Sequence, residues 1–218
     1  MINLERIKNH RLQTDPYRWT AITDLYTPND AERLAATYPC DHFKLVSAYG
    51  EREYHYEARS LIGMGAKVVS YPKELSEAWQ ALANDVLSPE YRTAMSVANV
   101  CHYGPGGNLD AHKDLPEKIV THVLYFNRSW NNLDGGCLTI LRSADLSDVA
   151  AEILPIVGCS SVLVRSDNSW HAVSRVVNPS VPSRRSMTVT FYRPGSVSTM
   201  WPPGDKTPLH RYQAADLR

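Results

Sequence analysis

The chain has 218 residues, a length that suggests one domain with a core large enough to need neither disulfides nor a structural metal. Its 23 Lys and Arg residues balance 23 Asp and Glu residues, so the formal net charge is +0. A protein that binds nucleic-acid phosphates usually has an excess of basic residues. Because this chain has no such excess, we expect no nucleic-acid partner.

Two further features bear on location. No apolar run approaches the ~20 residues that span a bilayer, and residues 1–19 carry charges throughout, without the apolar stretch of a secretory signal. The cysteines Cys40, Cys101, Cys137 and Cys159 are widely spaced, which is typical of free thiols in a reducing compartment. We expect a cytoplasmic protein without a membrane partner. The sequence leaves the oligomeric state open.

The first part of the chain, to about Pro89, mixes helix and strand signals. Residues 27–39 predict a helix, with Thr27 as its cap, Pro28 at its first position and Asp30 in its first turn. A second helix is predicted from about Pro72, with an apolar face that we interpret as core packing against a sheet. That face consists of Leu75, Trp79, Leu82 and Val86.

From about Ser96 the composition changes to short β-like runs separated by turn-forming residues. The predicted strands cover residues 97–103, 119–126, 136–142, 160–166 and 186–192. Many short strands with Gly- and Pro-containing turns indicate a jelly roll, with the early helices supporting one sheet, so the predicted class is α+β. Within one domain we expect a support (1–95), a core (96–195) and a Pro-rich arm or lid (196–218).

His112-Lys113-Asp114 is the first candidate for metal binding. On an extended segment, residues two apart point to the same side, so an imidazole and a carboxylate would project together. His171, just past a predicted strand, is the candidate third ligand. Two histidines and one carboxylate leave three positions open, which suits non-haem Fe(II), whereas structural zinc prefers a closed set, often rich in cysteine. The motif alone is also compatible with a surface loop.

The remaining histidines are interpreted as ordinary surface or core residues. They are His10, His42, His55, His102, His122 and His210. Of these, only His122, in the middle of a predicted strand, is considered as a side chain that could face the interior.

The strand that begins at Arg184 predicts an anion site. Alternation puts Arg184, Ser186 and Thr188 on one face, opposite an apolar face. If the polar face looks into a barrel, Arg184 is a buried cation that needs an anion, and its fork matches a carboxylate. The alternative is a solvent-facing polar strand. Arg185 points the other way, although a bulge would exchange the two arginines.

These segments, in this order, resemble the 2-oxoglutarate/Fe(II) oxygenase superfamily, and most closely its prolyl-4-hydroxylase-type branch. The matching stretches are YGPGGNLDAHKD, VTHVLYFN, DGGCLTIL, PIVGCSSVLVRSDNSWHAV and RRSMTVTFYRPG, within about residues 100–195. The resemblance implies a double-stranded β-helix core with N-terminal supporting helices, and an enzyme that uses Fe(II), 2-oxoglutarate and O2.

The resemblance also implies roles for individual residues. His112, Asp114 and His171 would bind iron and so carry catalysis. Arg184 would hold the C5 carboxylate of 2-oxoglutarate, and Ser186 would assist it. Because the family members that halogenate lack the carboxylate ligand, Asp114 disfavours halogenation.

Further positions match the branch less directly. Tyr125 matches a tyrosine that often donates to the same carboxylate, and Tyr103 matches another tyrosine that faces the co-substrate. Gly135 and Gly136 match a tight turn whose role is conformational. Leu109 departs from the branch, which often has an aromatic residue there, and this change leaves the substrate unsettled.

The expected reaction is oxidation, most simply hydroxylation, of a C–H bond, with release of succinate and CO2. A small core and neutral surface favour a small polar substrate, such as an amino acid or a natural-product intermediate. The candidate substrate contacts are Tyr54, Tyr56, Arg59, Asn99, His122 and Trp170, with Trp201 as a cap. The rival interpretations are a cupin-like metal-binding module without redox chemistry and a nucleic-acid demethylase on the same fold.

Overall fold

The computed structural model describes residues 2–38, 44–49, 52–60, 96–179 and 183–192. The predicted second helix, the C-terminal arm with Trp201, and the side chains of Tyr54, Tyr56, Arg59 and Asn99 lie outside the described part. The division of the chain into support, core and arm therefore remains a prediction.

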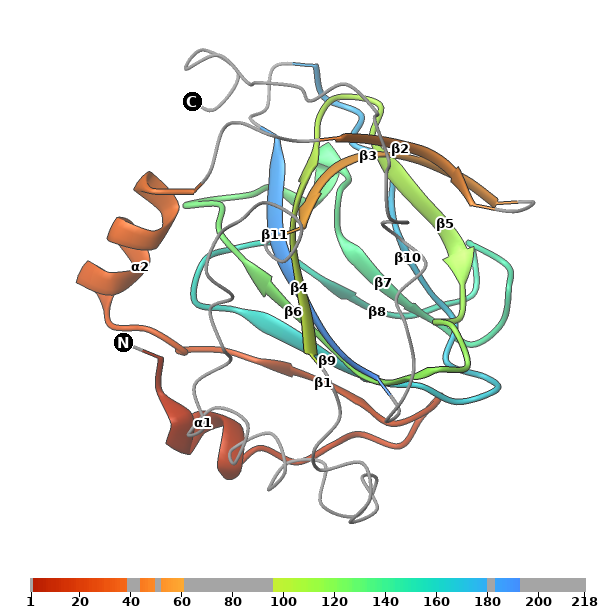
Figure 1. Ribbon diagram of the computed structural model, residues 1–218, viewed down its shortest axis with the longest axis horizontal. Coiled ribbons are helices and arrows are strands. Elements are labelled where there is room, and N and C mark those ends of the chain that lie inside the picture. Colours follow the sequence, from red (N-terminus) through yellow and green to blue (C-terminus); the bar gives the residue numbers. More distant parts are fainter. Residues whose placement is uncertain (1, 39–43, 50–51, 61–95, 180–182, 193–218) are drawn as a thin grey trace.

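Two short helices precede the core: α1 (Leu4–Lys8) and α2 (Pro28–Ala36). The predicted start of α2 is confirmed, because the Thr27 side chain accepts a hydrogen bond from the Asp30 amide and Pro28 occupies the first turn. Both helices lie on the side of the molecule away from β5 (Figure 1). In the described part, no helix is long and apolar enough to cross a membrane.

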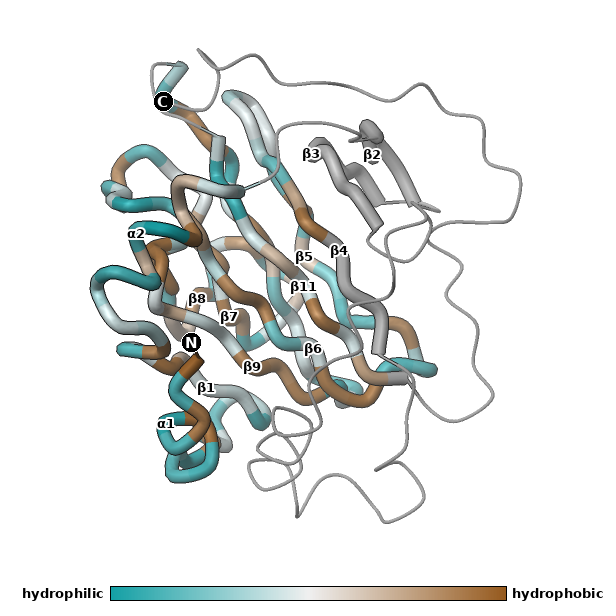
Figure 2. The backbone as a smooth tube through the Cα atoms, turned by 60° about the vertical axis from the view of Figure 1, so that its left-hand side comes forward, coloured by the Kyte–Doolittle hydropathy of each residue, from teal (hydrophilic) through white to brown (hydrophobic). Residues whose placement is uncertain are grey.

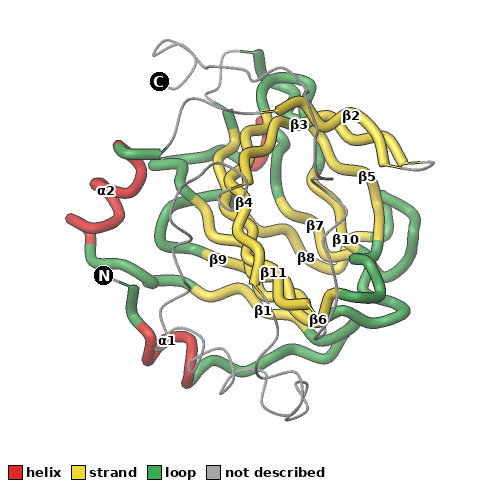
Figure 3. Tube along the Cα trace, in the orientation of Figure 1, coloured by secondary structure: helices red, strands yellow, loops and turns green. Residues whose placement is uncertain are grey.

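The rest of the described chain consists of antiparallel strands joined by loops (Figure 3). The N-terminal strands are β1 (Trp19–Ile22), β2 (Lys44–Tyr49) and β3 (Arg52–Ser60). The core strands are β4 (Ser96–Tyr103), β5 (Asn108–His112), β6 (Lys118–Tyr125), β7 (Leu138–Leu141), β8 (Val149–Ile153), β9 (Ser160–Val164), β10 (His171–Val173) and β11 (Arg184–Tyr192). All five predicted strands are present. β11 begins at Arg184, while β1, β2, β3, β5, β8 and β10 were not predicted as strands.

The strands form two layers that share β3. The first layer has the order β1-β9-β6-β11-β4-β3, with β2 paired to β3, and the second has the order β3-β5-β10-β7-β8. Core strands alternate between the layers, apart from the β7–β8 hairpin, which lies within the second layer, and this is the winding of a double-stranded β-helix. The predicted jelly-roll class is therefore confirmed.

Alternation along the strands of the first layer separates two apolar clusters. An outer cluster joins Ile7 of α1 to Val120 and Leu124 of β6, so the N-terminal segment supports the outer face of this layer. An inner cluster contains Val123 and Tyr125 of the same strand. Figure 2 shows the hydrophobic stretches concentrated on these strands. Polar side chains that project from the inner face are thus enclosed between the layers.

Candidate functional site

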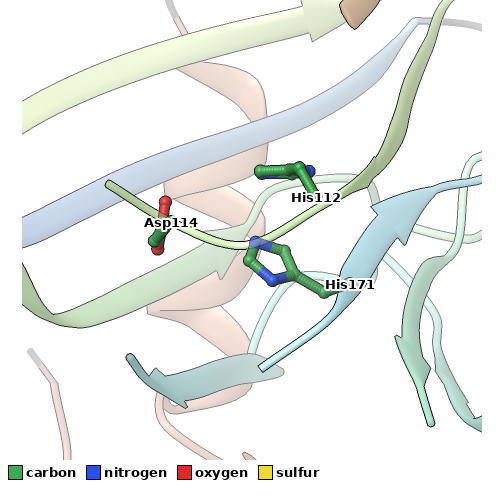
Figure 4. Close-up of side chains that lie close together, drawn as sticks. All are labelled: His112, Asp114 and His171. Carbon is green, nitrogen blue, oxygen red and sulfur yellow. The ribbon is translucent and has the colours of Figure 1, made fainter. Parts of the chain in front are cut away.

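Strand pairing brings the two candidate histidine ligands together. His171, the first residue of β10, is the direct cross-strand partner of His112, the last residue of β5, and the ring centroids are 4.2 Å apart. Asp114 lies just past the end of β5. One ligand atom from each of the three side chains lies within 4.8 Å of the others, and all three residues are buried (Figure 4). The predicted three residues therefore form a compact potential metal site.

Backbone carbonyl groups fix the orientation of both imidazoles. Nδ1 of His112 lies 2.8 Å from the Asp110 carbonyl oxygen, and Nδ1 of His171 lies 3.0 Å from the Ser169 carbonyl oxygen. A carbonyl accepts only, so each Nδ1 carries the proton and donates. Nε2 of each ring is then the nitrogen with the lone pair, as a metal ligand requires.

Asp114 is held as a carboxylate by two partners that the sequence did not reveal. Lys118 donates to Oδ1, and Thr121 donates to Oδ2 at 2.7 Å. Burial opposes ionisation of Asp114, but the charge of Lys118, with the two nearby histidines, outweighs it and holds the pKa below its usual range. The position of Lys118, four residues after Asp114, is the only sequence signal for this pairing.

His112 is neutral at physiological pH. Burial, followed by the neighbouring His171, lowers the pKa of His112 from 6.5 to about 3. Protons therefore compete little with a metal ion at this ring.

Arg184 is buried, with an exposed fraction of 1%, in the same interior. Its Nε donates to the Gly136 carbonyl oxygen at 2.7 Å, and Nη1 donates to Ser186 Oγ at 2.9 Å. The guanidinium carbon lies 4.7 Å from the ring centroid of Tyr103 and 5.4 Å from that of Tyr125. None of the described carboxylates forms an ion pair with Arg184. The result is a buried fixed cation that lacks a counter-ion from the described chain.

One face of β6 connects the two parts of the site. Thr121, which bonds to Asp114, and Tyr125, whose ring lies beside Arg184, both point inward from this strand. Tyr125 is held in place by a 2.6 Å hydrogen bond between its hydroxyl and Ser161 Oγ. The metal-ligand cluster and the cation therefore face the same interior.

The two glycines before β7 allow the backbone to reach Arg184. Gly135 and Gly136 have φ angles of +72° and +71°. A Cβ atom at Gly135 would lie 1.9 Å from the Arg175 carbonyl oxygen, which no side chain can tolerate. The conformational role predicted for both glycines is confirmed.

Arg185 and His122 lie on the outer faces of their strands, away from the metal-ligand cluster. Arg185 points away from Arg184, and its Nη1 lies 3.4 Å from the Ala35 carbonyl oxygen of α2, as the predicted parity requires. His122 also points outward, because its neighbours Thr121 and Val123 point inward. His122 as an interior-facing substrate contact is therefore a wrong prediction. Trp170 instead packs under the Lys113 ammonium, 4.9 Å from the ring centroid.

A double-stranded β-helix that holds two histidines and a carboxylate on neighbouring strand ends is the architecture of the non-haem iron oxygenases. The comparison with protein families agrees, since the model of the 2OG-Fe(II) oxygenase superfamily matches residues 98–192. Over residues 98–192 the chain thus has the core of an Fe(II)- and 2-oxoglutarate-dependent oxygenase, a class of enzyme that consumes O2. The predicted superfamily and cofactor set are confirmed.

Solved structures show the same fold across most of the chain. A prolyl-4-hydroxylase from Pseudomonas putida matches with a TM-score of 0.58 and 19% identity, covering 87% of this chain and 96% of that chain. A Trichoplax adhaerens prolyl hydroxylase in complex with a hypoxia inducible factor peptide fragment matches with a TM-score of 0.60 and 16% identity, covering 87% and 89%. Among curated proteins, the comparison finds no match. The fold is that of the prolyl-4-hydroxylase-like oxygenases.

Proposed function

We propose that this protein is a dioxygenase that hydroxylates a C–H bond of a small polar molecule, such as an amino acid or a natural-product intermediate, and releases succinate and CO2. Iron would be held by His112, Asp114 and His171. The C5 carboxylate of 2-oxoglutarate would be held by Arg184 with Ser186. The observation that carries the proposal is the buried Arg184 guanidinium, which has no described carboxylate partner and faces the same interior as the metal-ligand cluster.

The ligand residues fit Fe(II) in their chemistry. Two imidazoles and one carboxylate are a ligand set that suits Fe(II), and they would leave positions open for a chelating co-substrate and for O2. When bound, iron and 2-oxoglutarate supply the oxidising chemistry. The chain's own contribution is to hold the ligand atoms in place: Asp110 and Ser169 orient the imidazoles, and Lys118 and Thr121 orient the carboxylate.

The anion site fits one end of a dicarboxylate. The bonds to Gly136 and Ser186 use two of the five N–H donors of Arg184 and fix the plane of the guanidinium. A carboxylate that binds the remaining donors would find a preformed site, so little ordering entropy is lost on binding. Tyr125 and Tyr103 would confine this carboxylate, since both rings lie beside the guanidinium.

A metal-binding module without redox chemistry is the less favoured alternative. Such a module needs the three ligands but has no use for a buried cation beside them. The match to an oxygenase superfamily over residues 98–192 also favours the enzyme.

Thermal shift measurements test the co-substrate part of the proposal. 2-Oxoglutarate should raise the melting temperature of the wild-type protein in the presence of Mn(II), a redox-inert substitute for Fe(II), and much less in EDTA. Succinate should serve as a control ligand of similar charge that lacks the keto group. Equal stabilisation with and without metal would contradict joint binding of metal and 2-oxoglutarate.

Product analysis tests the substrate part. A panel of free amino acids, natural-product intermediates and proline-containing peptides is incubated with Fe(II), ascorbate and 2-oxoglutarate, and succinate and substrate mass are recorded. We expect a gain of one oxygen atom on a small polar molecule. Product from the peptides alone would contradict the proposed substrate class, and leave the oxygenase assignment intact.

A further inference from the structure

Tyr17 is a buried tyrosine that belongs to neither the metal-ligand cluster nor the anion site at Arg184. Its side chain has an exposed fraction of 3% and belongs to the inner apolar cluster, together with Tyr103 and Tyr125. Its hydroxyl has no hydrogen-bond partner among the residues that the structure describes. A buried hydroxyl without a partner costs about 1–3 kcal/mol, so its presence in this interior needs a reason.

The backbone around Tyr17 is tied to the turn that carries His171. Gln13 and Trp19 exchange backbone hydrogen bonds of 2.8 and 3.2 Å, which close a loop with Tyr17 inside it. The Asn168 side chain donates to the Pro16 carbonyl oxygen at 2.8 Å, and the Trp19 indole donates to the Asp15 carbonyl oxygen at 2.9 Å. Tyr17 is therefore positioned by the same turn that leads into His171.

Strand pairing brings Tyr17 towards Asp114. The Val164 amide donates to the carbonyl oxygen of Arg18 at 3.0 Å, and Nε of the next residue, Arg165, donates to the Asp114 carbonyl oxygen at 3.5 Å. Burial raises the pKa of Tyr17 well above its ordinary value, and the Asp114 carboxylate raises it further. The phenol is therefore a permanent donor, close enough to Asp114 to sense its charge. A donor in this position suits an anionic oxygen atom that binds beside the carboxylate ligand.

We infer that Tyr17 is a co-substrate-binding residue, whose hydroxyl donates a hydrogen bond to the carboxylate of 2-oxoglutarate at the metal end of the molecule. The inference rests on the proposed function. Arg184 would hold one end of the dicarboxylate and Tyr17 the other.

Removing the Tyr17 hydroxyl has opposite effects on the stability of the ligand-free protein, depending on whether the hydroxyl binds a ligand or supports the fold. Tyr17→Phe keeps the ring in the inner cluster and removes only the unpartnered group, so the ligand-free melting temperature should stay the same or rise. The dissociation constant for 2-oxoglutarate, measured anaerobically by calorimetry with Mn(II), should increase about tenfold, as expected for losing one hydrogen bond to a charged group.

Tyr26→Phe is the matched control. Tyr26 is a partly buried tyrosine that packs against the outer cluster, on the other side of the first layer. This variant should bind 2-oxoglutarate as tightly as the wild-type protein.

Two results would overturn the role of Tyr17. One is a Tyr17→Phe protein that binds 2-oxoglutarate as tightly as the wild type. The other is a ligand-free melting temperature several degrees lower, which would assign the hydroxyl to the fold. A wild-type protein that fails to bind 2-oxoglutarate with Mn(II) would instead refute the proposed function, and this inference with it.

Discussion

His112 and His171 are direct cross-strand partners, although they are separated by 59 positions in the sequence. The β5–β10 register therefore sets the spacing of the two imidazoles, and each ring is oriented by a carbonyl oxygen two residues before it. A slip of one residue would turn one ring to the opposite face of its strand. Backbone pairing, more than side-chain contacts, thus preorganises the metal-ligand cluster.

Removing any one ligand should abolish metal-dependent binding of 2-oxoglutarate. His112→Ala, Asp114→Ala and His171→Ala each remove one of the three protein ligands in a site that is built for all three, so the affinity for the metal ion should fall sharply. We expect no Mn(II)-dependent thermal shift and no succinate formation in these variants. His10→Ala, outside the site, serves as the control. Wild-type activity in His171→Ala would remove that residue from the ligand set.

Substitution of Arg184 should weaken the binding of 2-oxoglutarate, whereas substitution of the adjacent Arg185 should not. Arg184→Lys keeps the charge but loses the planar fork that is fixed by Gly136 and Ser186, so the KM for 2-oxoglutarate should rise by about tenfold or more. Arg185→Lys is the matched variant, since that side chain points to α2 and should affect only stability. A larger KM effect in Arg185→Lys than in Arg184→Lys would show that the strand faces are assigned the wrong way round.

Gly135→Ala should destabilise the fold more than an alanine at another left-handed glycine. At Gly135 the new methyl group would meet the Arg175 carbonyl oxygen, in addition to the cost of a positive φ. Gly158 has a φ of +90° and open space around a Cβ, so Gly158→Ala should cost only the conformational part, about 1–2 kcal/mol. Urea unfolding of both variants measures the difference, and equal losses would contradict the predicted clash.

The stability of the metal-free protein should fall as the pH drops below about 6.5. Burial lowers the pKa of His122 from 6.5 to about 3, so between these values the unfolded chain binds a proton that the folded protein does not. Stability is then lost as the pH falls, by up to about 1.4 kcal/mol per pH unit for this group.

His122→Gln tests the contribution of that histidine. The variant should show a shallower pH dependence of the unfolding free energy between pH 4.5 and 6, measured with EDTA present. His112 contributes in the same direction, because its pKa is also about 3, and should leave a residual slope. A slope identical to that of the wild type would show that His122 titrates alike in the folded and unfolded states.

Local patterns explain which parts of the fold were predictable. The start of α2 follows from Thr27 and Pro28, and β11 shows a clear alternation from Arg184 onward. β10 has only three residues and β8 reads VAAEI, so neither has a recognisable strand period. Their positions depend on pairing with β7, which a single sequence does not specify.

Some residues of the candidate site were likewise predictable from the sequence, and others were not. Its metal ligands and Arg184 stand in motifs with characteristic spacing, and the order of these motifs made the resemblance visible. Lys118 and Thr121 belong to no such motif, and they reach Asp114 only because the chain turns back between β5 and β6. Tyr17 lies far from the other site residues in the sequence, and no pattern around it indicates that its side chain is buried in the inner cluster.

The most direct test of the account is an anaerobic titration of the Fe(II)-loaded protein with 2-oxoglutarate, followed by visible absorbance. If iron and 2-oxoglutarate form a chelate at His112, Asp114 and His171, a weak metal-to-ligand charge-transfer band should appear and saturate, and it should be absent from His171→Ala. A protein that retains Fe(II) by metal analysis, yet shows no band at saturating 2-oxoglutarate, would contradict the central claim.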